Sequence, residues 1–299
     1  MTPLDWSWPG GRLCLDPARG RVTQVELGGR PAFWTAREAP DWNVGGDRLW
    51  FGPERDWFWA GDAAGGLADH LVPAEIDPAG WRLTEFTDSK AEFRTLVSLR
   101  DRATGARTRI EVRRRISLLH CAAEAVEYRS RNALRILDGP AGQPVSAWSV
   151  VQVPLGGTIG IELAGPLSYR DYLEPVDPDR LLVCDGRLTL ASTGSRMFKI
   201  GLPATVFAGT LRYTRAGMDI TRTVQVKADQ RYCDGPLGAD PDEPGDVLQI
   251  FEDDGHYGGY AELEHHGPAA IAGERPSVVD EYATVVRVDR APLSRAARR

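Results

Sequence analysis

Apolar and polar residues alternate over short segments of this chain, and glycine or proline separates most segments from the next. The two breakers supply 53 residues, as 32 glycines and 21 prolines. In Thr108 to Leu119 the side chains of Ile110, Val112, Ile116 and Leu118 share one parity, interrupted by Arg114. A period of two is typical of a strand that packs one face against a core. The pattern predicts an all-β protein with little room for helices.

A hairpin is predicted over Thr205 to Val226. Its two alternating arms flank Arg215-Ala216-Gly217, where glycine adopts a positive φ at little cost. The same alternation predicts further strands at Val22 to Leu27, Glu92 to Arg100, Ala125 to Ser130, Val145 to Val153, Thr158 to Leu163, Val247 to Phe251, Gly259 to Glu264 and Tyr282 to Val288.

Two segments, Pro53 to Glu85 and Asp234 to Asp246, are rich in glycine and proline and are predicted to be long loops. No internal repeat or shift of composition marks a boundary between domains. We therefore expect one large β-sandwich domain over residues 1–290, followed by a basic, frayed C-terminal tail at 291–299.

Composition narrows the class of protein. With 42% hydrophobic and 26% charged residues the chain is ordinarily globular. The formal net charge of −6, with basic residues spread along the chain, argues against a nucleic-acid partner. No segment approaches the roughly 20 apolar residues that a membrane helix needs, and the N-terminus lacks the features of a signal peptide. We expect a soluble, cytoplasmic protein without a membrane partner.

Three of the five histidines lie in the segment Phe251 to Pro268 together with five carboxylates. Side chains of these types suit proton transfer, metal ligation or sugar recognition. Period two places Glu262 and Glu264 on one face of a strand and His265 on the other, so the face turned to the ligand decides which of them reaches it. The adjacent rings of His265 and His266 would point in opposite directions, which argues against a shared zinc ion.

The sequence predicts that the protein works without a cofactor. One alternative is a structural calcium ion at Glu252 to His256, because an acidic turn offers several oxygen ligands. The sequence contains neither a phosphate-binding P-loop nor a dinucleotide-binding motif. Leu155-Gly156-Gly157 lacks the further glycines that these motifs require.

Five of the nine tryptophans lie between Trp34 and Trp59. Aromatic faces stack on the apolar faces of sugar rings, while asparagine, arginine and glutamate bind hydroxyl groups. The interleaving of these types in Trp42 to Glu54 therefore suits a small carbohydrate. The alternative is that the tryptophans only cap the end of a β core around a turn at Gly45-Gly46.

The run Trp42-Asn43-x-Gly45-Gly46-x-Arg48-x-Trp50, the following Gly52-Pro53-Glu54 and the late Glu262-Leu263-Glu264 before Gly267-Pro268 resemble the galactose mutarotase-like (aldose 1-epimerase-like) superfamily, especially its uncharacterised bacterial branches. This resemblance implies a large antiparallel β-sandwich, the supersandwich of the galactose mutarotase type. It also implies a sugar on one concave face and an isomerase, an aldose epimerase or mutarotase.

Site residues follow from the same resemblance. Leu263-Glu264 with Pro268 is similar to the context of the family's catalytic glutamate, which makes Glu264 the predicted general base. The predicted substrate contacts are Asn43, Arg48, Trp50, Glu54, Tyr260 and Glu262.

The family's general-acid histidine lies mid-chain, whereas this chain has no histidine between Cys121 and Gly255. The resemblance leaves three candidates for the proton donor: His256, His265 and Lys199. Lysine would serve only with a lowered pKa, and Lys199 as a strand residue whose amine reaches out to solvent is the alternative. Two functions follow: an epimerase, or a non-catalytic carbohydrate-binding or regulatory module that has lost the acid. The identity of the sugar and the oligomeric state stay open.

Overall fold

The computed structural model describes residues 4–36, 42–60 and 66–289. The predicted tail at 291–299 lies outside these residues, and the expectation of one domain over 1–290 stays a prediction. No helix in the described part of the chain is long and apolar enough to cross a membrane.

Two antiparallel sheets form the molecule, one of eleven strands and one of ten among the described residues. The eleven-stranded sheet, called the first sheet below, has the order β1 (Leu4–Trp8), β2 (Gly11–Asp16), β3 (Arg21–Leu27), β5 (Asp47–Gly52), β10 (Pro144–Pro154), β19 (Tyr260–His266), β18 (Asp246–Glu252), β15 (Phe198–Pro203) and β12 (Arg170–Asp171), with β4 (Arg30–Pro31) on β3 and β20 (Ala270–Ile271) on β10.

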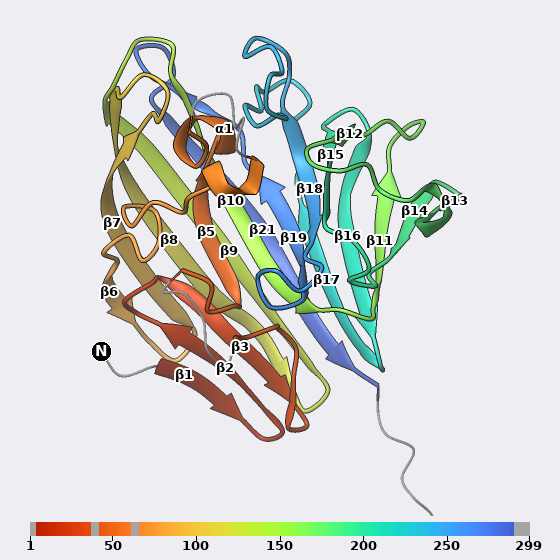
Figure 1. Cartoon of the computed structure of the whole chain (residues 1–299). Coiled ribbons are helices and arrows are strands. Elements are labelled where there is room, and N and C mark those ends of the chain that lie inside the picture. Colours follow the sequence, from red (N-terminus) through yellow and green to blue (C-terminus); the bar gives the residue numbers. More distant parts are fainter. Residues whose placement is uncertain (1–3, 37–41, 61–65, 290–299) are drawn as a thin grey trace, which may run out of the picture.

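The ten-stranded second sheet has the order β13 (Leu181–Cys184), β14 (Arg187–Ala191), β11 (Thr158–Leu163), β16 (Phe207–Arg215), β17 (Met218–Val224), β21 (Ser277–Val288), β9 (Ala125–Asp138), β8 (Arg107–Ala122), β7 (Lys90–Arg100) and β6 (Arg82–Phe86). Helices are short: α1 (Glu54–Trp57), η1 (Gly66–Asp69) and η2 (Pro178–Arg180). Figure 1 shows the sheets as two layers, with α1 just beyond the end of β5. The predicted all-β sandwich of two large antiparallel sheets is therefore confirmed.

Alternating side chains face inward and form one apolar core between the sheets. The predicted hairpin is confirmed as β16 and β17, with φ of +47° at Ala216 and +71° at Gly217 in its turn. The prediction of a continuous loop over Pro53 to Glu85 is wrong in part, because this range contains α1, η1 and the start of β6.

A polar group in the core joins the two sheets. The carboxylate of Asp47 on β5 accepts hydrogen bonds from Arg114 at 2.9 Å, from Tyr128 at 2.8 Å and from Tyr282 at 3.1 Å, all from the second sheet. Arg114, which interrupts the apolar parity of its strand, is fully buried. A buried guanidinium needs an anion as partner, and Asp47 supplies it across the sandwich.

Candidate functional site

A pocket opens on the outer face of the first sheet, the face turned away from the second sheet. Its lining comes from alternate residues of β5, β10, β15, β18 and β19, from α1 and from loops. Aromatic side chains dominate it: Trp42, Trp50, Trp59, Trp148, Tyr172, Phe251, Tyr257 and Tyr260. Charged or titratable lining residues are Arg48, Glu54, Arg55, His70, Lys199 and Glu262. A pocket with aromatic walls and a few polar groups is a usual form of small-ligand site.

Strand register brings these side chains together. Lys199 lies opposite Phe251, and Phe251 lies opposite Glu262, across three neighbouring strands. Trp50 lies opposite Trp148 on the next pair, with their rings 5.2 Å apart in an edge-to-face arrangement. Because residues directly opposite share one face of a sheet, both rows point into the same pocket.

Arg48 and Glu262 form the first charged pair of the pocket. The Arg48 guanidinium lies 2.6 Å from Glu262 Oε1 and stacks 3.6 Å from the centroid of the Trp50 ring. Gln152 also donates to Glu262 Oε1, at 3.0 Å, and to the side chain of Asn43 at 2.8 Å. Burial raises the pKa of Glu262, although the charge of Arg48 opposes the shift. A carboxylate with a raised pKa is a stronger base than one in water.

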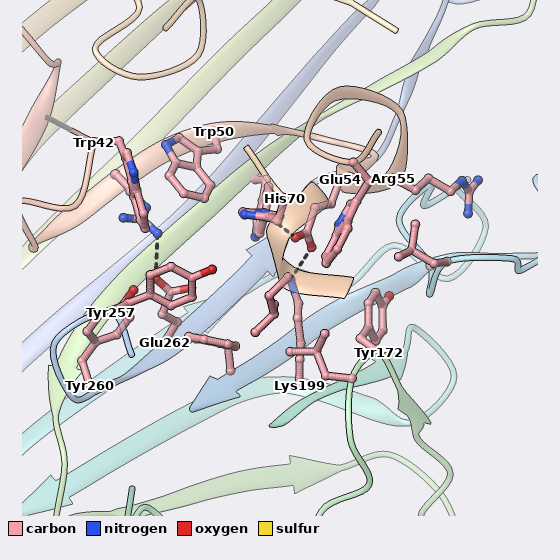
Figure 2. A pocket seen from close by; sticks show the side chains of 18 residues that line it. Trp42, Trp50, Glu54, Arg55, His70, Tyr172, Lys199, Tyr257, Tyr260 and Glu262 are labelled. Carbon is pink, nitrogen blue, oxygen red and sulfur yellow. Dashed lines mark hydrogen bonds and ion pairs between the residues drawn. The ribbon is translucent and has the colours of Figure 1, made fainter. Parts of the chain in front are cut away.

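Lys199 forms the second charged group. Its Nζ lies 2.6 Å from Glu54 Oε2 and 3.1 Å from Glu264 Oε2, and 4.6 Å from the centre of the Trp148 ring. The other oxygen of Glu54 lies 3.2 Å from His70 Nε2, and Figure 2 shows this carboxylate between His70 and Lys199.

The pKa values around Lys199 follow from one cation among several acids. Burial alone would lower the pKa of Lys199, but the charges of Glu264, Glu54 and Asp234 outweigh it and raise the pKa above its usual value. The pKa of Glu54 is below its usual range, because Lys199 and His70 outweigh the opposing effect of burial. Burial raises the pKa of Asp234 to about 6 and that of Glu264 to about 8. Glu54 is therefore the carboxylate that stays ionised, while Glu264 retains a proton most readily.

Glu264 lies beneath the pocket floor. It is fully buried, does not line the pocket, and accepts a hydrogen bond of 2.8 Å from Trp148 Nε1. His266 stacks against the Trp148 ring, with ring centres 5.2 Å apart. Burial, together with the charge of Lys199, lowers the pKa of His266 well below its usual value, so this imidazole is neutral.

Six of the residues predicted from sequence line the pocket: Arg48, Trp50, Glu54, Lys199, Tyr260 and Glu262. Asn43 is buried and does not line the pocket; it accepts the bond from Gln152 and donates to Tyr257 O at 2.8 Å. Period two in β19 is confirmed, since Glu262 faces the pocket while His265 contacts Asp280 of the second sheet at 3.1 Å.

His256 and His265 do not reach the pocket. His256 is exposed on the β18–β19 loop, where its ring packs edge-on against Tyr257 at 4.6 Å. The interpretation of Lys199 as a solvent-reaching strand residue is wrong, because its side chain is 7% exposed and ion-paired. Its pKa also moves in the opposite direction from the lowering that a lysine acid would need.

His70 is the titratable pocket residue that the sequence did not indicate. It lies in the segment interpreted as a loop. This segment folds back next to α1, because His70 forms a β-bridge with Trp59 and the Leu71 amide donates a hydrogen bond to Phe58 O. Trp148, on a predicted strand, was likewise missed. Neither residue carries a local motif, so no signal in the sequence could have found them.

The acidic turn proposed for calcium is occupied by other bonds. Glu252 binds the Arg180 guanidinium at 2.6 Å and the Gly194 amide at 2.7 Å. Asp253 accepts from the amides of Tyr257 at 3.0 Å and Gly259 at 2.6 Å. Among the described residues, no group of three or more His, Cys, Asp or Glu side chains is placed to hold a metal ion.

Comparison with known proteins places the fold. Residues 36–134 match the profile of a family described as a family of unknown function, DUF6786. No curated protein matches the chain.

Solved structures align over nearly the whole chain. A candidate aldose 1-epimerase from Escherichia coli K12 is 12% identical with a TM-score of 0.62, covering 96% of this chain and 99% of that one. A galactose mutarotase-like protein from Lactobacillus casei ATCC 334 is 11% identical with a TM-score of 0.56, covering 96% and 100%. An aldose epimerase homologue from C. elegans is 9% identical with a TM-score of 0.53, covering 96% and 99%. The chain has the galactose mutarotase-like fold.

Proposed function

We propose that the protein binds a small sugar in this pocket and interconverts its anomers, as an aldose 1-epimerase-like isomerase. The observation that carries the proposal is the combination of aromatic walls with Glu262, Glu54 and His70 in one pocket. The fold is shared with proteins described as aldose 1-epimerase or mutarotase homologues. Aromatic faces provide stacking for the ring, and the charged groups provide hydroxyl contacts and proton transfer.

Glu262 is the general base in this proposal. The sequence pointed to Glu264, but a base must lie within hydrogen-bond reach of the proton that it removes, and Glu264 is fully buried beneath Lys199 and Trp148. The hydrogen bonds to Glu262 found among the described residues end on Oε1. Its Oε2 is therefore the atom assigned to the anomeric hydroxyl.

His70 is the general acid. Imidazole is the side chain best suited to transfer protons near neutrality, and Glu54 orients His70 through its Nε2. Lys199 retains its proton too tightly for this role, because neighbouring carboxylates raise its pKa. Its part is to neutralise Glu54 and donate a hydrogen bond to the ligand.

The reaction then requires that one proton be removed from the sugar and one proton be delivered to it. Glu262 removes the proton of the anomeric hydroxyl while His70 protonates the ring oxygen, and the bond between the anomeric carbon and the ring oxygen breaks. Rotation of the open-chain aldehyde and return of both protons closes the ring with the opposite anomeric configuration. Each positioned acid or base contributes roughly 10²–10⁴ in rate.

A binding or regulatory module is the second candidate. The observation in its favour is that Glu262 and Glu54 are each already paired with a cation, Arg48 and Lys199. Carboxylates held in this way can recognise hydroxyl groups without transferring a proton.

One set of measurements separates these functions. Anomer exchange of galactose and glucose is followed by NMR for the wild type, Glu262→Gln, His70→Asn and the exposed control Glu162→Gln, and binding is followed by thermal unfolding. Sugar at about 100 times its Kd adds roughly 2.7 kcal/mol to the free energy of unfolding, enough to move the midpoint by several degrees.

The isomerase proposal expects Glu262→Gln and His70→Asn to lose exchange while the sugar-dependent shift in midpoint remains. Unchanged exchange in Glu262→Gln refutes Glu262 as base, and loss of exchange in Glu264→Gln alone would return that role to Glu264. Binding without exchange in the wild type identifies a module. If no aldose, sugar phosphate, uronic acid or short oligosaccharide shifts the midpoint, the proposal that the pocket binds a sugar is refuted.

A further inference from the structure

Arginines gather on the outer face of the second sheet, on the opposite side of the sandwich from the pocket. Three shallow hollows adjoin there across β7, β8, β9 and β21, the long strands of Figure 1. Neighbouring hollows share lining residues, among them Arg113, Arg131 and Val279, so they form one continuous groove, called the arginine groove below. Six arginines line it: Arg94, Arg113, Arg115, Arg129, Arg131 and Arg135.

Strand pairing places these arginines side by side. Arg94 lies opposite Arg113 on the next strand, and Arg115 lies opposite Arg131. Like charges directly opposite each other on a sheet are destabilising. Glu92 and Glu281 offset part of this repulsion, and a further anion bound along the strands would offset more of it.

The carboxylates of the groove neutralise the arginines only in part. Glu92 alone contacts Arg113 at 2.5 Å, Arg115 at 3.0 Å and Arg94 at 3.3 Å. Burial alone would raise its pKa, but the hydrogen bonds from these arginines lower it to about 2. Glu281 contacts two more arginines, at 3.4 and 3.5 Å. Glu111, Asp280 and Lys227 also line the groove. Six arginines and one lysine thus face four carboxylates, which leaves an excess of positive charge on a chain whose net charge is −6.

The floor of the groove favours one kind of polyanion. Among the described lining residues the only aromatic one is Tyr282, which is buried and bonded to Asp47 in the core. Single-stranded nucleic acids stack their bases on aromatic side chains, and protein partners are anchored by aromatic residues. Small residues such as Ala133 and Ala283 line this groove instead, which leaves room for a chain lying flat.

The exposed carboxylate of Glu281 distinguishes between the two remaining kinds of polyanion, duplex DNA and a polyuronate. Glu281 is 39% exposed between Arg129 and Arg131. Duplex DNA carries one charge per about 1.7 Å of axis and no hydroxyl donor along its backbone, so Glu281 would repel it. A polyuronate has a lower density of charge and carries hydroxyl groups between its carboxylates. Glu281 can accept hydrogen bonds from these hydroxyl groups.

We propose that the arginine groove binds a linear acidic polysaccharide of the polyuronate type, with its carboxylates on the guanidinium groups and its hydroxyls on Glu281. The proposal does not depend on the ligand or activity of the pocket, which lies on the other sheet.

Polygalacturonate is the probe, with neutral dextran and a DNA duplex as comparison polymers, and binding to the full chain is measured by titration calorimetry. The test variant is Arg129→Ser/Arg131→Ser, whose side chains are 48% and 53% exposed. The matched control is Arg187→Ser/Arg212→Ser on the same sheet outside the groove, at 51% and 48%. Arg129 and Arg131 both pair with Glu281, whereas Arg187 pairs with Glu162 and Arg212 with Asp219. All four are surface side chains, so both variants should keep the fold.

The groove variant should bind polygalacturonate about tenfold more weakly, which corresponds to about 1.4 kcal/mol, and the control should match the wild type. Wild-type affinity should fall with added salt, and dextran should not bind. Absence of polygalacturonate binding, or equal weakening in both variants, overturns the proposal. Tighter binding of the duplex with the same dependence on Arg129 and Arg131 replaces it with a nucleic-acid surface. A change in the sugar response of the pocket is expected in neither variant, so the two proposals fail separately.

Discussion

Replacing Lys199 by methionine removes the cation that pairs with Glu54 in the pocket wall and with Glu264 beneath the pocket floor. Methionine keeps much of the length and apolar contact of lysine against Trp148, so the change deletes mainly the charge. Glu54 would lose a partner at 2.6 Å and Glu264 one at 3.1 Å, and the two carboxylates are only 11% and 0% exposed. Removing one partner of a buried ion pair costs about 3–5 kcal/mol, because the remaining charge is left uncompensated.

The size of this loss should depend on pH. Glu54 has its pKa held below the ordinary value of 4.5, so its ion pairs stabilise the fold above that pH and lose their effect as the pH falls further. At pH 7 the variant should therefore show the full loss, and the difference from the wild type should shrink below about pH 4.5. For a chain of this size each kcal/mol moves the midpoint by about 2–4 °C, so a shift on the order of 10 °C is expected at pH 7.

Urea and thermal unfolding at pH 7 and pH 4 measure both effects. Lys90→Met is the control, since this lysine pairs with Glu85 at the surface with side chains 33% and 39% exposed. Such a pair contributes about 0–1 kcal/mol. A Lys199→Met protein as stable as the wild type at pH 7, or one whose deficit stays constant down to pH 4, would refute the reasoning.

Three more outcomes are expected. Gly45→Ala should cost more than about 2 kcal/mol in urea unfolding, because Gly45 has a φ of +90° and an added Cβ would lie 2.1 Å from Trp34 O, whereas Gly28→Ala, at φ +58° with open space around it, should cost about 1–2 kcal/mol; equal losses would contradict this. Trp148→Phe should cost about 1–3 kcal/mol through the lost bond to Glu264, and a cost near zero would mean that this bond contributes nothing. The raised pKa of Glu264 means that wild-type stability falls as the pH rises from about 4.5 towards 8, so Glu264→Gln should show a flatter profile between pH 5.5 and 8.5; identical slopes would exclude Glu264 as the source.

Alternation predicted several strands that have one face in water. β8 and β16 alternate buried and exposed residues, which makes a period of two easy to see. β5 is buried on both faces, between the core and the pocket, so its polar and aromatic residues suggested a binding motif without revealing a strand. β15 is likewise buried over nearly its whole length and was missed, although the equally buried β10, β18 and β19 were predicted. Burial on both faces therefore weakens the signal of a strand without removing it.

The candidate site was found through motifs near Arg48 and Glu262, and its completion depended on contacts distant in sequence. Glu54 meets Lys199 across 145 residues, and no local pattern encodes that pairing. His70 reaches Glu54 through the return of an irregular segment. Such contacts are set by how the layers pack, which a single sequence does not display.

The side of β19 that faces the core sets the position of the side that faces the pocket. On this strand the backbone oxygen of Leu263 accepts a hydrogen bond of 2.8 Å from Arg222, and His265 meets Asp280, both from the second sheet. A slip of one residue would turn Glu262 inward and Leu263 outward. Contacts with the second sheet thus fix the register of β19 and, with it, which side chains face the pocket. Substitutions at Arg222 or Asp280 can therefore alter ligand recognition while leaving every pocket residue unchanged.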